Sequence, residues 1–208
     1  MGKIPLEPEK YYHLFNHANG MENLFLSSDN YNFFISKYIQ HISPIAKTYA
    51  YCLMPNHFHF AIQIKPKEQL ENYINKKFTN NNAKKWQSNI ERFISKQFSN
   101  LFSSYTQAFN KQQNRMGSLF IPNFSRKEVA SDEYIRQLIR YIHFNPVHHG
   151  FKSDIREWNY SSYNSIILEL DSCINQTELL EFFNSLEDFI EFHSNWSNYQ
   201  TQKSSLDL

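Results

Sequence analysis

The hydrophobic and polar positions along the chain switch between the two-residue period of β-strands and the longer period of α-helices. Alternating apolar residues predict three strands in the N-terminal part, because side chains of a strand point in turn to opposite faces. These strands cover residues 11–19, 45–53 and 57–65. Pro55-Asn56 supplies a turn between the last two, so we expect them to pair as an antiparallel hairpin.

Apolar residues at helical spacing predict helices between and after these strands. The longer helices cover about residues 29–42, 66–78, 90–111 and 131–145. Ser131 is a suitable N-cap for the last of them, and Asn145-Pro146 is expected to end it. The polar stretch 79–89 is interpreted as an inserted loop, and residues 117–129 are expected to be extended.

Strands that flank helices, with an antiparallel hairpin among them, predict an α+β fold. We expect an antiparallel central sheet with helices packed on it and a C-terminal helical extension. A length of 208 residues fits one domain with an appendage. The predicted division is a main domain over residues 1–168 and an acidic helical extension and tail over residues 169–208.

The composition allows a sizeable core and excludes several classes of site and segment. Hydrophobic residues are 41% of the chain, with 19 Phe and 13 Tyr, so a sizeable core is available. The four glycines form neither a GxGxxG motif nor a phosphate-binding loop. The chain has no run of eighteen apolar residues and no apolar leader, so we expect no membrane partner and a cytoplasmic location. Cys52 and Cys173 stand alone and are predicted to be reduced thiols.

The net charge of +1 hides an uneven distribution. Residues 76–127 contain ten Lys or Arg and one acid, whereas residues 169–208 contain eight acids and one base. A basic segment can follow the phosphates of a nucleic acid, although it can also be an ordinary solvated helix face. The candidate DNA-binding residues in this segment are Lys84, Lys85, Arg92, Lys96, Arg115, Arg126 and Lys127.

The hairpin carries the first candidate for chemistry, because His57 and His59 point to the same face of their strand. The opposite face is apolar and is predicted to be buried; it carries Phe58, Phe60, Ile62 and Ile64. Two imidazoles are half of a metal site, and an amide oxygen such as that of Asn145 is a suitable third ligand. The alternative is that the two histidines are hydrogen-bonded cleft residues without a metal.

The last predicted helix carries the second candidate. Four residues share one stripe of this helix, Tyr134, Leu138, Tyr141 and Asn145. A second, apolar stripe is the better candidate for the core and contains Ile135, Ile139 and Ile142. His143 lies nearly opposite Tyr141, so we do not expect it in a site built around that residue. A phenol can attack phosphorus when it is positioned in line and its charge is balanced, but a helical tyrosine usually only packs.

Two motifs together resemble a known family. Met54-Pro-Asn-His-Phe-His59 and Tyr141-Ile-His-Phe-Asn-Pro-Val-His-His-Gly-Phe151 are similar to the metal and tyrosine motifs of the single-tyrosine HUH transposases of IS type. The resemblance is strongest to the branch of REP-associated tyrosine transposases and covers about residues 11–165. Further similar blocks are Tyr12–Gly20, Phe109–Asn110, Gly117–Phe120 and Trp158–Tyr163.

The resemblance implies a ferredoxin-like sandwich with His57 and His59 as metal ligands and Tyr141 as the nucleophile. Asn145 occupies the position of a metal-binding amide in that family. The implied activity is cleavage and rejoining of single-stranded DNA near hairpins through a 5′-phosphotyrosine intermediate, with Mg²⁺ or Mn²⁺ as cofactor. Association with the nucleoid, as a monomer or a homodimer, would accompany it.

Two other functions are compatible with the same residues. A domesticated relative could hold DNA or RNA hairpins without cutting them, since the basic segment with interleaved aromatic residues suits phosphate contacts and base stacking. A metal-dependent phosphodiester hydrolase could use water in place of the tyrosine.

Overall fold

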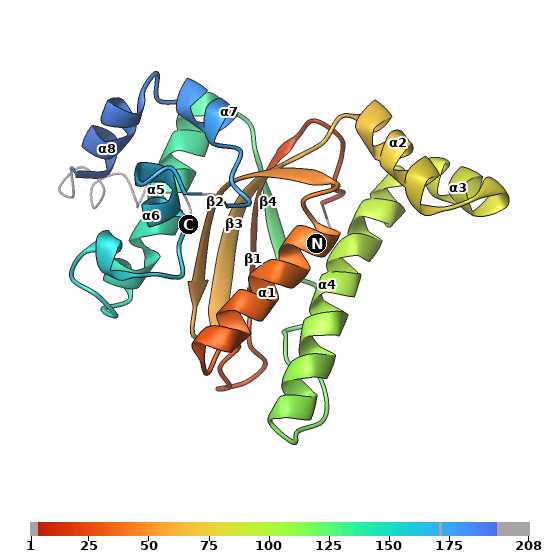
Figure 1. Ribbon diagram of the computed structural model, residues 1–208, viewed down its shortest axis with the longest axis horizontal. Helices are drawn as coiled ribbons and strands as arrows, with labels where there is room; N and C mark the ends of the chain where they lie inside the picture. Colours follow the sequence, from red (N-terminus) through yellow and green to blue (C-terminus); the bar gives the residue numbers. More distant parts are fainter. Residues whose placement is uncertain (1–3, 171, 195–208) are drawn as a thin grey trace.

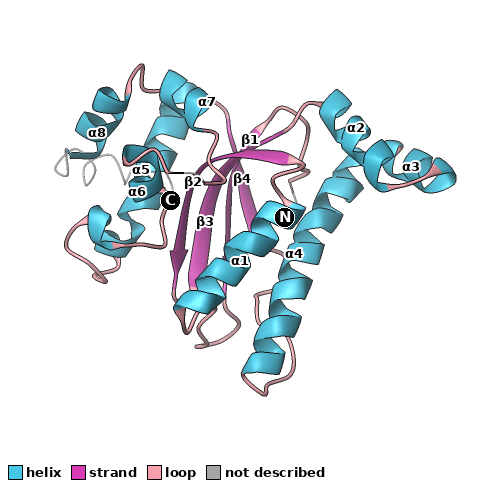
Figure 2. Ribbon diagram, viewed as in Figure 1, coloured by secondary structure: helices cyan, strands magenta, loops and turns pink. Residues whose placement is uncertain are grey.

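A four-stranded antiparallel sheet forms the centre of the computed structural model, which describes residues 4–170 and 172–194 (Figure 2). Its strands are β1 (Tyr11–His17), β2 (Ala46–Met54), β3 (His57–Ile64) and β4 (Ser125–Val129). The spatial order is β2-β3-β1-β4, and every neighbouring pair is antiparallel. The predicted hairpin is confirmed as the pair β2–β3, in which Met54 faces His57.

Helices cover both faces of this sheet (Figure 1). The long ones are α1 (Ser28–His41) and α4 (Ile90–Gln112) on one face and α5 (Asp132–His148) on the other. The shorter ones are α2 (Lys67–Lys77), α3 (Asn80–Gln87), η1 (Ile155–Glu157), α6 (Tyr163–Ile167), α7 (Gln176–Glu181) and α8 (Leu186–Ser194). The predicted α+β class, an antiparallel sheet with helices packed on it, is therefore confirmed.

The sheet face toward α1 and α4 is built from aromatic and branched side chains. Phe58, Phe60, Ile62 and Ile64 are each at most 2% exposed, as their alternation predicted. Phe60 stacks on Tyr38 of α1 with 4.2 Å between ring centroids. Each buried side chain of this size stabilises the fold by roughly 2–3 kcal/mol relative to exposure.

The opposite face carries small residues under α5. Ala50, Cys52 and Ala61 are completely buried and belong to the same core as Ile139 and Ile142 of α5. Short side chains allow a helix backbone to approach a sheet closely. As a result, side chains of α5 and β3 can meet over a short distance.

The predicted loop at residues 79–89 is wrong, because the structure has helix α3 there. Although the sequence of α3 is mostly polar, one short face of the helix is buried. Ala83 is 6% exposed, and the Trp86 ring lies 5.7 Å from that of Phe93 and 6.2 Å from that of Phe78. These contacts stabilise a helix that local composition does not favour.

The predicted end of the last long helix at Asn145 is also wrong, since α5 continues through Pro146 to His148. Proline disfavours the helical conformation of the preceding residue, but both residues are buried here. The backbone N–H of His149 donates to the carbonyl of Asn145 at 3.0 Å and closes the last turn. Asn145 thus keeps the helical direction that places it one turn after Tyr141.

Only part of the expected extended stretch 117–129 is a strand, because β4 begins at Ser125. The segment before it pairs with the end of β1 through a single bridge between Ala18 and Phe120. Pro122 and Asn123 follow that bridge, and Asn123 has a backbone φ of 65°. This left-handed residue turns the segment and leaves it to run alongside α4 rather than in the sheet.

The C-terminal helices pack on α5 through a line of buried hydrogen bonds. The Tyr51 N–H donates to Ser162 Oγ at 2.9 Å, and Ser162 Oγ lies 2.8 Å from His143 Nε2. His143 Nδ1 is 2.9 Å from His193 Nε2 of α8, and His193 Nδ1–H donates to the carbonyl of Phe189 at 2.8 Å. His143 therefore faces α8 and not the Tyr141 side of its helix, as predicted.

Of the predicted helical extension and tail at residues 169–208, residue 171 and residues 195–208 lie outside the described residues. Within residues 4–170 and 172–194, no helix has the length and apolar character required to cross a bilayer.

The buried His193 should make stability depend on pH. Burial lowers the pKa of His193 to about 3, so the fold favours the neutral ring. In the unfolded chain the imidazole of His193 has the ordinary histidine pKa of about 6.5, so it binds a proton below that pH. The contribution of His193 to the free energy of unfolding should be fully present above that pH. It should decrease by about 2 kcal/mol as pH falls from roughly 6.5 to 5. Urea unfolding at several pH values measures this slope.

The matched variants separate His193 from the other histidines. Between about pH 6.5 and 5, the free energy of unfolding of His193→Gln should decrease by about 2 kcal/mol less than that of wild type. His148→Gln, which replaces an exposed ring at the end of α5, should keep the wild-type slope. Identical slopes for wild type and His193→Gln would contradict the assignment.

Candidate active site

Helix α5 and strand β3 bring Tyr141, His57 and His59 together within one chain. The Tyr141 ring lies 5.5 Å from the His59 ring and 6.0 Å from the His13 ring, both edge-on. The rings of His57 and His59 are 5.2 Å apart. Because the tyrosine and the imidazoles meet without a second copy of the chain, the cluster is complete within the described protomer.

Asn145 joins this cluster through its side-chain oxygen, which lies 3.4 Å from His57 Nε2. Its Nδ2 donates to the Tyr141 carbonyl at 3.1 Å, and a carbonyl can only accept. That bond fixes the amide so that the oxygen faces His57. On the other side of the ring, His57 Nδ1 lies 2.8 Å from the Asn56 side-chain oxygen, which accepts the Nδ1 proton. His57 Nε2 then presents a lone pair toward the lone pairs of Asn145 Oδ1.

Two facing lone pairs fit a shared cation. Ligand atoms that each lie about 2.1 Å from an ion at a right angle are about 3 Å apart. The 3.4 Å between His57 Nε2 and Asn145 Oδ1 is close to that separation and long for a hydrogen bond. Within the described residues, no group of three His, Cys, Asp or Glu side chains is arranged to hold a metal. The third ligand here would be the amide oxygen of Asn145, with water completing the coordination.

His59 is held by a residue that sequence analysis did not single out. His59 Nδ1 lies 2.9 Å from His13 Nε2 of β1, and His13 is 2% exposed. If His59 coordinates an ion through Nε2, its Nδ1 carries the proton and His13 accepts it, as partners of metal-bound imidazoles commonly do. The alternation of His13, Phe15 and His17 along β1 was the available signal. His17 also belongs to this face, and its ring stacks on that of His57 at 4.7 Å.

Burial keeps these imidazoles neutral, which is the form that binds metals. Desolvation lowers the pKa of His57 to about 4 and that of His13 to about 3. It also lowers the pKa of His59 well below the ordinary value, and the neighbouring histidines add to this effect. The site therefore presents uncharged ring nitrogens at neutral pH.

The phenol of Tyr141 is also neutral. Burial raises the pKa of Tyr141, and hydrogen bonding with Asn145 only partly opposes this shift. A protonated phenol is a weak nucleophile, so its reaction requires positive charge near the developing phenolate and loss of its proton during attack.

The structure separates the seven candidate DNA-binding residues. Lys127 faces His13 across the β1–β4 pair and so lies on the histidine face of the sheet. Arg126 is on the other face, where its guanidinium lies 5.1 Å above the Phe124 ring. Arg115 forms an ion pair with Glu22 at 2.6 Å and hydrogen-bonds to the Ser118 carbonyl, so it holds the turn after α4. The remaining candidates are exposed on α3 and α4, across the sheet from α5 (Figure 1), and are Lys84, Lys85, Arg92 and Lys96.

Comparisons with known proteins give one relative by sequence and one solved structure with a similar fold. No protein-family model matches the chain. A Haemophilus influenzae protein whose name places it among the REP-associated tyrosine transposases is 25% identical over 120 residues, which are 57% of this chain and 59% of that protein. This chain thus matches less than two thirds of the length of that relative.

A solved structure shares the fold. The REP-associated tyrosine transposase bound to a REP hairpin superposes with a TM-score of 0.55 at 15% identity, over 83% of this chain and 88% of the other. The resemblance to REP-associated tyrosine transposases that the two motifs predicted is therefore confirmed, by sequence in the curated relative and by fold in the solved structure.

Proposed function

We propose that this protein is a metal-dependent transposase or nuclease that cleaves and rejoins single-stranded DNA near hairpins through a phosphotyrosine intermediate. The observation that carries the proposal is the convergence of Tyr141 with His57, His59 and Asn145. The similar solved protein is bound to a REP hairpin, which supports hairpin DNA as the substrate class.

The metal ligands in this proposal are His57 Nε2, His59 and Asn145 Oδ1. Imidazole nitrogens favour Mn²⁺ over Mg²⁺, although either ion accepts an amide oxygen. A bound divalent ion supplies charge that polarises the scissile phosphate and orients it. Asn56 and His13 would hold the protons of the two imidazoles on Nδ1, which leaves both Nε2 atoms for the ion.

The covalent step begins with the hydroxyl of Tyr141. Its oxygen attacks phosphorus while its proton passes to a water molecule, and the bond from phosphorus to the 3′-oxygen of the preceding nucleotide breaks. That 3′-oxygen takes up a proton from water, so the products are a 5′-phosphotyrosine and a free 3′-hydroxyl, with no net gain or loss of protons. Attack by a 3′-hydroxyl on the phosphotyrosine reverses the step, and the retained ester bond makes an external energy source unnecessary.

Hairpin binding without cleavage is the second candidate function. Tyr141 is only 8% exposed, and burial raises its pKa. Both properties would suit a chain that binds a hairpin with its exposed basic residues and no longer cuts it.

Replacing the nucleophile tests the covalent step. Tyr141→Phe should abolish the covalent protein–DNA adduct that wild type forms with hairpin-bearing single-stranded DNA and Mn²⁺, because no phenolic oxygen remains. We expect a loss of at least about 1000-fold, in line with removal of a catalytic nucleophile. Denaturing electrophoresis of a labelled oligonucleotide measures the adduct, and a filter-binding assay should show unchanged hairpin affinity.

The control is Tyr134→Phe, which changes another tyrosine of the same helix and should form the adduct normally. An adduct from Tyr141→Phe would refute the assigned nucleophile. A free 5′-phosphate without an adduct in wild type would point to hydrolysis by water. Tight binding without any cleavage across divalent metals would favour the hairpin-binding function.

Replacing the amide tests the metal site separately. Asn145→Ala should weaken Mn²⁺ binding by about 10-fold or more, because one of three protein ligands is lost. Asn145→Asp should retain the affinity, since a carboxylate oxygen takes the same place. Titration of free Mn²⁺ by electron paramagnetic resonance measures the dissociation constant.

His148→Ala is the matched control for the metal titration because this exposed histidine lies outside the cluster. It should bind Mn²⁺ as wild type does. Equal affinities for wild type and Asn145→Ala would remove Asn145 from the ligand set.

A further inference from the structure

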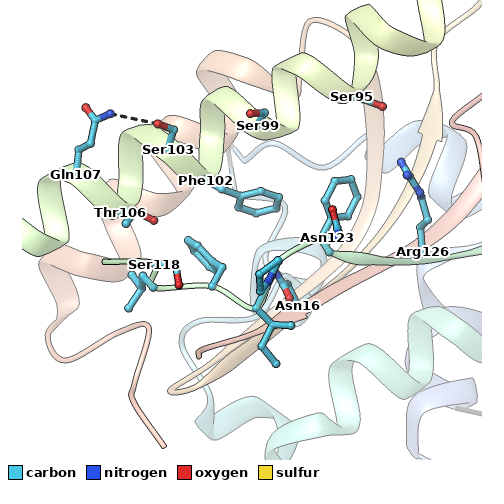
Figure 3. A pocket seen from close by; sticks show the side chains of 15 residues that line it. Asn16, Ser95, Ser99, Phe102, Ser103, Thr106, Gln107, Ser118, Asn123 and Arg126 are labelled. Atoms are coloured by element: carbon cyan, nitrogen blue, oxygen red, sulfur yellow. Dashed lines mark hydrogen bonds between the residues drawn. The ribbon is translucent and has the colours of Figure 1, made fainter. Parts of the chain in front are cut away.

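A cavity of ≈ 620 Å³ lies between α4 and residues 118–126, apart from the Tyr141 cluster (Figure 3). Its volume is within the range of about 300–1,000 Å³ that is usual for small-ligand sites. Neither Tyr141 nor any histidine is among its lining residues. The function proposed above leaves this cavity without a role.

The floor of the cavity is aromatic. Phe102 of α4 lies 5.0 Å from Phe120 and 5.4 Å from Phe124, measured between ring centroids. Phe102 and Phe124 are half-buried, so part of their surface is open to the cavity. Aromatic surfaces of this kind stack nucleobases in proteins that bind single strands.

The rim on the α4 side is a row of hydroxyl groups. The spacing of three and four residues places them on one stripe of the helix, and they are Ser95, Ser99, Ser103 and Thr106. Figure 3 shows this row facing the segment that carries Ser118 and Asn123. Hydroxyl and amide groups can both donate and accept, which suits the polar edge of a base.

One end of the cavity is positively charged. Arg126 lies at the same end as Ser95 (Figure 3), and its guanidinium packs over Phe124. Its Nη1 is buried and has no hydrogen-bond acceptor within the described part of the chain. Arg92 and Lys96 are exposed on the adjoining turn of α4, and the residues that line the cavity include no acid. A phosphate group at this end of the cavity would complement the charge of these three side chains.

The cavity is connected to the catalytic cluster through β1. Ile121 of its wall donates its N–H to the His17 carbonyl at 2.9 Å and accepts from Asn16 Nδ2 at 3.1 Å. The side chain of His17 stacks on His57 at the other face of the sheet. β1 thus links the wall of the cavity to the histidines of the cluster, and β4 is the edge strand beside it, around which a DNA strand would pass to reach Tyr141.

We propose that this cavity binds one unpaired nucleotide of the single-stranded DNA that flanks the hairpin. Its base stacks on Phe102 and Phe124 while its phosphate contacts Arg126. This inference rests on the proposed function, because it assumes that DNA is the substrate. It adds an anchoring site that would set which phosphate reaches Tyr141.

Filling the cavity is the first test. Ser99→Trp places an indole over the aromatic floor from an exposed position, so the fold should persist. The probes are a hairpin with single-stranded flanks and the same hairpin without flanks, both read by fluorescence anisotropy. We expect Ser99→Trp to weaken binding of the flanked hairpin about 10-fold, in line with the loss of one stacked base. Its affinity for the bare hairpin should be unchanged. The control Ser28→Trp, at an exposed serine of α1, should change neither.

Locating the base and the phosphate is the second test. With 2-aminopurine placed in turn at each flanking position, one position should be quenched by wild type and not by Ser99→Trp. Arg126→Gln should reduce the slope of log affinity against log salt concentration by about 0.7, the value for one phosphate of a single strand. Arg126→Lys should keep the slope because it keeps the charge.

The outcomes distinguish this inference from the proposed function. If wild type binds the bare and the flanked hairpins equally, or if Ser99→Trp binds the flanked hairpin normally, the cavity does not hold a nucleotide although hairpin binding stands. If wild type binds neither DNA, the proposed function fails as well. Preferential binding of an RNA flank of the same sequence would overturn DNA as the occupant.

Discussion

The close packing of α5 against β2 and β3 is the constraint on which the site depends. Ala50, Cys52 and Ala61 leave room for the helix, and its approach brings Tyr141 to within 5.5 Å of the His59 ring. The rotation of α5 about its axis matters equally. On the side of the helix away from the site, His143 is bound to Ser162 and to His193. Since His143 lies midway between Tyr141 and Asn145 in sequence, this anchor limits rotation of the turn that carries both.

Burial favours the neutral form of both kinds of group in the cluster, with opposite consequences for their chemistry. It favours the neutral imidazoles that a metal requires, and it also favours the neutral phenol, which is the unreactive form of a nucleophile. A cation between the histidines and Asn145 would reconcile the two, because its charge compensates the developing phenolate in a low-dielectric environment. The polar contacts of Asn56 and His13 orient the imidazoles in the absence of an ion, so little reorganisation would accompany the binding of one.

Local periodicity was sufficient to predict much of this arrangement. The shared face of His57 and His59 follows from the two-residue period of a strand, and the stripe of Tyr141 and Asn145 follows from the helical period. The role of His13 could not be predicted in the same way, because its contact with His59 depends on the register between β1 and β3. That register joins segments 46 residues apart in sequence.

Two other differences have tertiary causes. Helix α3 forms because Trp86 finds an aromatic partner in α4, which no local pattern of the Asn-rich stretch reveals. The basic residues were predicted as one segment from their sequence clustering. The fold places Arg126 and Lys127 on opposite faces of β4, since neighbouring residues of a strand point to opposite sides. Charge counted along a sequence does not indicate which face it occupies.

The hydrogen bond from Asn145 Nδ2 to the Tyr141 carbonyl spans one turn of α5, so it links the amide to the residue proposed as the nucleophile. Their separation is therefore set by helix pitch rather than by any loop. Changes in loop length elsewhere could tilt the whole turn against the sheet, yet the spacing between Tyr141 and Asn145 along the helix would persist. A single residue inserted between them would turn Asn145 about 100° away. A chain with this insertion would need a compensating deletion in the same turn to return Tyr141 and Asn145 to one side of the helix.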